Sequence, residues 1–282
     1  MEFTKKLCGS QLEILIHDEW EFSDLIQKSF EYWEYFEKKY SRFIENNYLD
    51  TLNKNKFTHD IDVDFYNIVS LAQNISKISE WYFDISILPF LENKWYWKSQ
   101  VKIVENIWYK NIILEKNSLQ LKNNISIDIW ALWKWFIVDK IYYILDKKIN
   151  NFTINFWWDI RIKWEKNILL EDPNNENKVI WSIDLKNNSL ASSSWLKRNF
   201  WKHHHLINPH SWESQNEVIW VFVQHNSCVF ADSFSTALFV SPIDVSINIL
   251  KKMKWLEAMI ILKNGKIHKT KWFNFIQNSL WK

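Results

Sequence analysis

Four long segments carry apolar residues at the three- and four-residue spacing of an amphipathic helix. In the second of them, Ile68, Leu71 and Ile75 fall on a single stripe. Pro242 interrupts the last segment and predicts a second helix beginning there, because proline suits the first turn of a helix and not its interior. The predicted helices cover residues 22–47 (ending near Asn46), 62–80, 136–149 and 231–253.

Shorter runs between these segments alternate apolar and polar residues with the period of two that is typical of strands. Residues 257–273 predict a hairpin around Asn264–Gly265, a dipeptide that suits a tight turn between two strands. No repeat or Pro/Ser-rich linker divides the chain. Helices mixed with hairpin-type strands predict an α+β fold. The other predicted strands are residues 11–18, 152–156, 179–185 and 218–226, with short strands between 96 and 128.

The composition is unusually rich in tryptophan and unusually poor in glycine. The 282 residues include 20 Trp and only 2 Gly, among many Lys, Asn and Ile. Ordinary proteins contain about 7% glycine, which is roughly 20 residues at this length. We therefore interpret the sequence as a translation in which a UGA codon that specifies glycine was read as tryptophan.

The positions of the tryptophans favour this interpretation over its alternative, a genuine Trp-rich protein that stacks sugars or bases on its indoles. Stacking residues should occupy strand faces, whereas many of these lie at expected turns. In "NFWWDIRIKW", a strand at Asn155–Phe156 runs into a charged turn at Asp159–Arg161, with two indoles at the bend. Further turn positions are Trp20, Trp81, Trp95, Trp97, Trp195, Trp212 and Trp255.

Charge and cysteine content exclude several classes of protein. The net charge of +2 is too small for the basic surface that binds nucleic acid. No apolar run reaches the roughly 20 residues of a membrane span. Cys8 and Cys228 are too few for a disulfide framework. The start, residues 1–20, lacks the apolar stretch of a signal peptide, so the sequence predicts a cytoplasmic protein.

Residues 128–136, "DIWALWKWF", become Asp-Ile-Gly-Ala-Leu-Gly-Lys-Gly-Phe if tryptophan stands for glycine. A glycine-rich loop directly before a helix can present backbone N–H groups and the helix dipole to a phosphate. Lys134 adds a cation. The alternative is a tight turn with a solvated lysine, and this segment alone does not separate the two.

Two further motifs carry candidate ligands. Asp232 and Thr236 stand four apart on one face of a predicted helix start, where their oxygens suit Mg²⁺. A plain N-terminus capped by Asp232 is the better interpretation of that motif alone.

"KHHHLINPHSW" offers a general base near neutral pH, although a polar turn is again the simpler interpretation. Adjacent histidines on an extended segment point to opposite faces, and no HExxH or CxxC supports zinc. These histidines are His203, His204, His205 and His210.

The order of the motifs resembles the ApbE-type flavin transferase family. With glycine restored, the chain reads DIGALGKG, N-x-GGDIR, ASSSG, H-L-I-N-P-x-S-G and ADSFSTALF in turn. Upstream, "YSRF" at Tyr40–Phe43, "LN" at Leu52–Asn53 and "SEWYFDIS" extend the resemblance from about Cys8 to Phe273. Tryptophan stands where the family has glycine at Trp81, Trp95, Trp97, Trp130, Trp135, Trp157, Trp158, Trp212 and Trp255.

The resemblance implies one two-lobed α+β domain over residues 1–282, with mixed and antiparallel sheets flanked by helices and an FAD cleft between the lobes. Its core would span about 8–273. Mg²⁺ would bridge the pyrophosphate of FAD to Asp232, Thr236 and the backbone carbonyl of Ala131. His205 would lie near the acceptor hydroxyl and act in catalysis with Asp232. The implied FAD-binding residues are Asn53, Tyr82, Asp84, Ala131, Lys134, Asn155, Asp159 and Ser193.

The implied activity is Mg²⁺-dependent transfer of FMN from FAD to a threonine or serine of an acceptor protein, with AMP leaving. The acceptor would carry an FMN-binding domain, as in subunits of ion-translocating redox complexes. An FAD hydrolase, a non-catalytic FAD-binding protein and a carbohydrate-binding module are the alternatives. Many relatives are exported and membrane-anchored, which contrasts with the cytoplasmic location predicted from the start of this chain.

Overall fold

An antiparallel sheet of eight strands forms the centre of the protein. The computed structural model describes residues 1–7, 10–19, 22–87, 108–157, 159–172, 175–194, 199–200, 203–204 and 206–277. The strand order is β1-β2-β6-β7-β10-β13-β14-β15, and every pairing in it is antiparallel. The strands are β1 (Glu2–Leu7), β2 (Ser10–Ile16), β6 (Phe152–Phe156), β7 (Asp159–Lys163), β10 (Ser189–Ser194), β13 (Val218–His225), β14 (Glu257–Leu262) and β15 (Ile267–Lys269).

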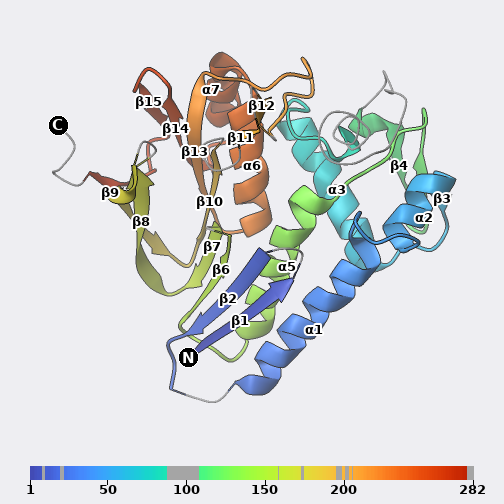
Figure 1. The fold of residues 1–282 in the computed structure, drawn as a ribbon, viewed down its shortest axis with the longest axis horizontal. Coiled ribbons are helices and arrows are strands. Elements are labelled where there is room, and N and C mark those ends of the chain that lie inside the picture. Colours follow the sequence, from blue (N-terminus) through green and yellow to red (C-terminus); the bar gives the residue numbers. More distant parts are fainter. Residues whose placement is uncertain are drawn as a thin grey trace.

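The helices cover one face of this sheet in layers. Helix α6 packs on β10 and β13, α5 packs on α6, and α1 and α3 pack on α5, so α5 and α6 lie between the sheet and the outer helices (Figure 1). The helices are α1 (Ser23–Tyr40), α2 (Tyr48–Asn55), α3 (Val63–Ile78), α5 (Trp130–Leu145), α6 (Cys228–Val240) and α7 (Ile243–Lys252), with short 3₁₀ turns η1 (Ile85–Ile87) and η3 (Tyr109–Asn111).

Small sheets complete the described fold. Strands β8 and β9 form a long hairpin with β16 at its edge, on the far side of the large sheet from the helices (Figure 1). A second small sheet, in the order β3-β5-β4, lies beside α2 and α3. These strands are β3 (Phe57–Thr58), β4 (Ile112–Leu114), β5 (Leu119–Leu121), β8 (Glu165–Asp172), β9 (Asn175–Lys186) and β16 (Ile276–Gln277), and a separate pair is β11 (Asn199–Phe200) with β12 (His203–His204).

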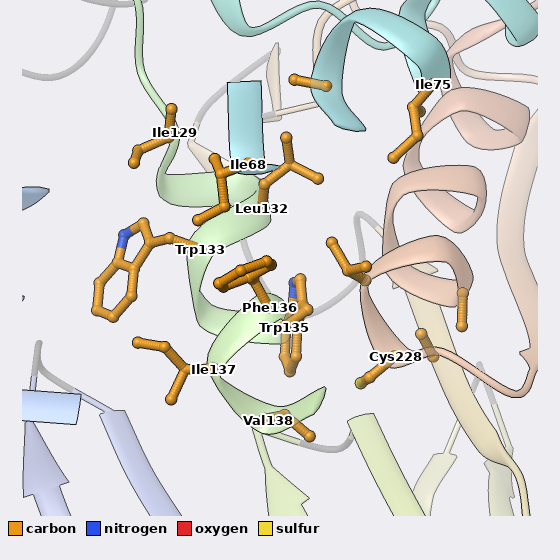
Figure 2. Close-up of a cluster of buried hydrophobic side chains, with 14 of the residues drawn as sticks. Ile68, Ile75, Ile129, Leu132, Trp133, Trp135, Phe136, Ile137, Val138 and Cys228 are labelled. Carbon is orange, nitrogen blue, oxygen red and sulfur yellow. The ribbon is translucent and has the colours of Figure 1, made fainter. Parts of the chain in front are cut away.

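Both faces of the large sheet are buried, because alternate residues of its strands enter two different hydrophobic clusters. In β13, Val221 and Val223 face the helices, whereas Trp220 and Phe222 face the β8–β9 hairpin. The cluster on the helix side is the larger, and α5 runs through it. Figure 2 shows part of this core, where side chains of α5 meet Cys228 of α6. The α+β prediction is therefore confirmed, with helices on one face and a hairpin on the other.

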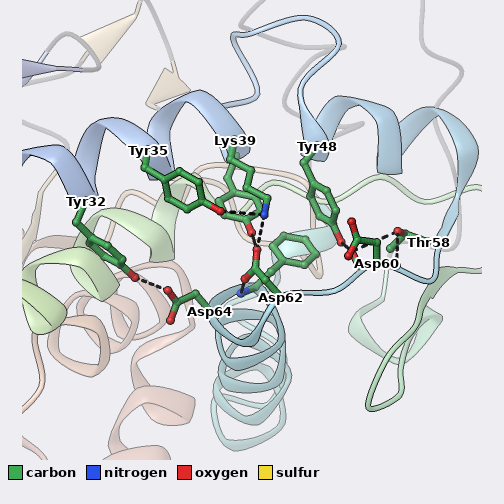
Figure 3. A network of polar contacts seen from close by, with 10 residues as sticks. Tyr32, Tyr35, Lys39, Tyr48, Thr58, Asp60, Asp62 and Asp64 are labelled. Atoms are coloured by element: carbon green, nitrogen blue, oxygen red, sulfur yellow. Dashed lines mark hydrogen bonds and ion pairs between the residues drawn. The ribbon is translucent and has the colours of Figure 1, made fainter.

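Hydroxyl and carboxylate groups join the outer helices to each other (Figure 3). Asp62 caps α3 by accepting from the backbone N–H of Phe65 at 2.8 Å, and it also accepts from Lys39 at 2.7 Å and from the phenol of Tyr40. Tyr32 donates to Asp64 at 2.6 Å. Burial, followed by the bond to Asp62, raises the pKa of Tyr40 far above its usual value, so this phenol stays a donor.

Several predicted boundaries are wrong. The first helix ends at Tyr40 and not near Asn46, because Asn47 begins α2 as its N-cap and accepts from the N–H of Asp50. Asp159–Arg161 belongs to strand β7 and not to a turn, since Asp159 already pairs with Phe156 and Arg161 with Ile154 of β6. Helix α5 begins at Trp130, six residues before the predicted start at 136. The strand at 152–156 and the hairpin around Gly265 are confirmed.

Candidate functional site

Two helices and two strands bring the predicted site residues together where α5 and α6 meet the large sheet. Asp159 opens β7, Ser193 lies in β10, Lys134 lies in α5, and Asp232 and Thr236 lie in α6. Asp159, Ser193, Lys134 and Asp232 are all buried. The two-residue connection between β6 and β7 places Asp159 at the start of its strand, and α6 packs directly on β10.

The two carboxylates of this site lie close enough to repel each other. Burial, followed by the charge of Asp232, raises the pKa of Asp159 well above its usual value. Burial likewise raises the pKa of Asp232 to about 8, while Lys134 lowers it. Lys134 acts in the same direction on Asp159 and on Asp128. Among the described residues, Lys134 is the cation that acts on both carboxylates, one positive charge against two negative ones when Asp159 and Asp232 are ionised.

Hydroxyl groups line the same place. Ser193 Oγ lies 2.7 Å from Ser235 Oγ and 3.4 Å from Thr236 Oγ1, which joins β10 to α6. Asp159 Oδ1 accepts from the backbone N–H of Ser192 at 2.8 Å, which fixes one of its oxygens. The site thus presents carboxylate and hydroxyl oxygens to a single small volume.

Asp232 does not cap a helix. Helix α6 begins at Cys228 with Ser227 as its N-cap, so Asp232 lies in the second turn and Thr236 one turn further on. The interpretation of Asp232 as a plain cap is therefore wrong. The sequence prediction began the helix at Ala231 and overlooked Ser227, which is a residue type common at N-caps.

The cap of α6 comes instead from another helix. Asp139 of α5 accepts from Ser227 Oγ at 2.6 Å, from the N–H of Cys228 at 2.8 Å and from that of Val229 at 3.3 Å. It also forms an ion pair with the buried Arg161 of β7. One carboxylate therefore joins the three elements that carry Lys134, Asp159 and Asp232. Sequence reasoning missed Asp139, because nothing local to it signals a bond 89 residues away.

The start of α5 is helical where a glycine-type loop was predicted. Asp128 Oδ1 accepts from the N–H of Trp130 at 2.8 Å, and the other oxygen of Asp128 pairs with Arg42 at 3.2 Å. Ala131 follows within the first turn and is exposed. Because a helical carbonyl already accepts along the helix, a metal at Ala131 would need the second lone pair of that oxygen. Neither Asp128 nor Arg42 was predicted as a site residue.

Two predicted flavin-binding residues have structural partners. Asn53 donates to the carbonyl of Ile127 at 2.9 Å and accepts from the N–H of Ile127 at 2.8 Å. Asp84 accepts from Ser86 twice and from the N–H of Tyr109 at 2.8 Å. Asn53 therefore holds the segment that precedes α5, and Asp84 holds η1 and the start of η3. Their contact with a flavin stays a prediction.

Two other predicted flavin-binding residues are Asn155 and Tyr82. Asn155 donates to Glu13 at 2.9 Å, but its buried Oδ1 has no hydrogen-bond partner within the described part of the chain. Tyr82 stacks on His210, with ring centroids 4.0 Å apart, and Trp81 stacks on the same imidazole at 3.7 Å. His205 lies outside the described residues.

The sequence matches the ApbE family over residues 8–260. The chain belongs to the ApbE family. Its fold is similar to that of the ApbE protein of Thermotoga maritima, with a TM-score of 0.83, 21% identity, and coverage of 96% of this chain and 97% of that one. It is also similar to the flavin transferase ApbE of Vibrio cholerae, with a TM-score of 0.82 at 16% identity over 97% of both chains.

A third similar structure is the flavinyl transferase ApbE of Pseudomonas stutzeri in its apo form. Its TM-score is 0.81 at 16% identity, with 96% of this chain and 94% of that chain covered. At these identities the likeness establishes a shared fold. A comparison with curated proteins finds no match. Within the described ranges, no helix is long and apolar enough to cross a membrane.

The site of this ApbE-family chain fits a hard divalent cation by the chemistry of its donors. Among the described residues no group of three His, Cys, Asp or Glu side chains could hold a metal alone. Two buried carboxylates, Asp159 and Asp232, and the Thr236 hydroxyl instead supply oxygen atoms, the ligands that Mg²⁺ prefers. Mg²⁺ usually keeps part of its shell for water and substrate phosphates, so an incomplete protein shell agrees with it.

Proposed function

We propose that this protein transfers FMN from FAD to a threonine or serine hydroxyl of an acceptor protein in a Mg²⁺-dependent reaction that releases AMP. The observation that supports the proposal is the meeting of Asp159 and Asp232 with Lys134 and the Ser193–Thr236 hydroxyls, in a chain that belongs to the ApbE family. Two of the similar structures are named flavin or flavinyl transferases.

Each side chain has a role in this proposal. Asp232 and Thr236 would hold Mg²⁺, and Asp159 would add negative charge beside them. Lys134 would pair with the pyrophosphate. The partnerless Oδ1 of Asn155 would accept from a ligand donor, because a buried acceptor without a partner is costly.

The chemistry requires alignment more than covalent participation by the protein. Bound Mg²⁺ would neutralise charge on the pyrophosphate. The acceptor oxygen forms a bond to the phosphorus of FMN, and the bond from that phosphorus to the oxygen of AMP breaks. The hydroxyl proton passes to a base, for which His205 is the expected residue.

The test uses the protein with glycine at all tryptophan positions, which we call the all-glycine version. It is mixed with FAD, Mg²⁺ and an FMN-binding acceptor domain that carries the target threonine, and the intact mass of the acceptor is read. A mass gain of one FMN that is lost without Mg²⁺ is the expected result.

Two outcomes would contradict the proposal. An unmodified acceptor with AMP and free FMN in solution would indicate a hydrolase. An unmodified acceptor with intact FAD, repeated over several acceptor domains, would indicate a binding protein. A matched reaction with the threonine of the acceptor changed to alanine controls for non-covalent flavin.

A further inference from the structure

Tryptophan occupies backbone conformations that large side chains avoid. Of the described residues other than glycine, ten have positive φ, and four of them are tryptophan. Asparagine accounts for four more, as expected from its tolerance of the left-handed region, whereas a bulky residue there is an outlier. The tryptophans are Trp81 (φ 56°), Trp157 (φ 53°), Trp164 (φ 89°) and Trp212 (φ 62°).

The four positions belong to different kinds of turn, each of which commonly contains glycine. Trp81 follows the end of α3, and its N–H donates to the carbonyl of Ser76 at 2.6 Å, the closing bond of a Schellman motif. The usual glycine position of that motif is held by Glu80 (φ 53°), so Trp81 is the second of two consecutive residues with positive φ. Trp157 is the first residue of the two-residue loop between β6 and β7, a loop that requires positive φ in its favoured form. Trp164 joins β7 to β8, and Trp212 closes the turn after Asn208.

Burial does not compensate for this strain. The side chains of Trp157 and Trp164 are 45% and 56% exposed, so little apolar surface leaves water in exchange for the strained backbone. Strain retained for function clusters at one site. Here it is spread over a helix end, a hairpin, a strand junction and a loop.

Buried tryptophans give a second, independent signal. The indole N–H groups of Trp133 and Trp220 are buried and have no hydrogen-bond partner within the described ranges. Buried indoles normally find an acceptor, and each missing bond destabilises the folded chain. Glycine at these positions has no side-chain donor to satisfy. In Figure 2 Trp133 and Trp135 leave α5 on different sides, so no single packing role explains both.

Indoles also occupy the candidate site itself. Lys134 Nζ lies 4.0 Å from the ring centre of Trp130 and 5.3 Å from that of Trp157. The indole of Trp135 lies close enough to Asp232, the predicted metal ligand, to lower the pKa of that carboxyl. Glycine at these positions would remove the indoles that lie beside the lysine and the carboxylate.

We propose that the functional chain carries glycine and not tryptophan at positions 81, 157, 164 and 212, and that one reassigned codon, UGA, gives glycine at the other tryptophan positions as well. The proposal stands on backbone geometry and unsatisfied donors, and does not depend on the proposed enzymatic function. It extends the compositional hypothesis to named positions at which the backbone itself demands glycine.

Tandem mass spectrometry of the protein isolated from the cells that encode it tests the proposal directly. Peptides that cover the four positions should show glycine at each, and tryptophan at any of them would overturn the proposal. The gene gives an independent check. The gene is expected to have UGA at all four positions. UGG, the ordinary tryptophan codon, at any one of them would refute the claim that a single reassigned codon accounts for all four.

A stability measurement on the chain as printed tests the strain argument. Trp81→Gly, Trp157→Gly, Trp164→Gly and Trp212→Gly together should move the denaturation midpoint upward. The matched control changes Trp108, Trp255 and Trp272 to glycine, since these side chains are exposed like those of Trp157 and Trp164 but have negative φ. An upward shift for the control, or none for the first set, would contradict the role of backbone strain. If the printed chain does not fold, mass spectrometry alone decides.

Discussion

Helices α5 and α6 supply facing halves of one site, yet they differ sharply in composition. Helix α6 contains neither tryptophan nor glycine, its small residues Ala231, Ser233 and Ser235 are buried, and it packs directly on β10 and β13. Helix α5 opens with Trp130, and Trp133 and Trp135 follow within its first turns. The half without tryptophan presents Asp232 and Thr236 in the spacing expected from the sequence. In the α5 half, indoles lie around Lys134. Reading a glycine codon as tryptophan therefore has its largest effect in this half, where the backbone must come close to a ligand.

The largest effect is expected at the residue that joins the two halves. Asp139→Ala in the all-glycine version leaves Arg161 buried without its partner and removes the cap of α6. Loss of one member of a buried ion pair costs about 3–5 kcal/mol. Urea denaturation should show a loss of this size. Lys163→Ala is the control, since its ion pair with Asp146 is more exposed, and an equal loss there would contradict the central role of Asp139.

The α6 half is tested by Asp232→Ala in the all-glycine version. Loss of a metal ligand should lower Mg²⁺-dependent FMN transfer by at least about 100-fold, because the metal is expected to supply several kcal/mol. The far-UV circular dichroism should be unchanged. Asp244→Ala, an exposed carboxylate on the next helix, should keep full transfer. Full transfer by Asp232→Ala would refute its assignment as a ligand.

The α5 half is tested by keeping tryptophan at position 135 alone and glycine at every other tryptophan position. The indole should lie beside Asp232 and compete with the metal for that carboxylate, which should reduce the apparent affinity for Mg²⁺ by about 10-fold, equivalent to about 1.4 kcal/mol. Calorimetric titration with Mg²⁺ measures this. Tryptophan kept at exposed position 272 is the control, and equal affinities in the two proteins would show that the indole of Trp135 does not obstruct the metal.

The smallest effect concerns His225, at the end of β13 beside the start of α6. Burial lowers its pKa, with Ser227 and Asp139 acting against this. Because the unfolded chain then binds a proton that the folded chain does not, stability is full above the unfolded pKa of about 6.5 and falls as pH drops below it. His225→Gln should flatten this dependence between pH 7 and 5.5, by well under about 1.4 kcal/mol per pH unit. Denaturation midpoints at both pH values check it, and an unchanged slope would contradict the assignment.

The sequence predicted those parts of the fold that depend on local pattern. The α3 helix, the strand at 152–156 and the hairpin at Gly265 follow from periodicity and turn chemistry alone. The start of α5 did not, because glycine-type spacing indicated a loop, whereas the helix begins there at Trp130, whose N–H donates to Asp128.

The site divides in the same way. Asp232, Asp159 and Lys134 could be named from motifs and a family resemblance, since each lies within a recognisable run of residues. Asp139 and Arg42 could not, because their partners come from distant segments and only the fold brings them together. Asn53 and Asp84 were named as flavin-binding residues, but the bonds they make in the structure are to neighbouring backbone.

The cap that Asp139 provides also has a consequence for the order of folding. Ser227 makes no side-chain cap bond, so the first amides of α6 acquire an acceptor only when a residue 88 to 90 positions earlier is docked against them. Contacts of such long sequence separation carry a large loop-closure cost and form late. The start of α6 should therefore be secured near the end of folding. Its amides at Cys228 and Val229 should then exchange with solvent only when the whole domain opens, which ties the integrity of the site to the global stability of the chain.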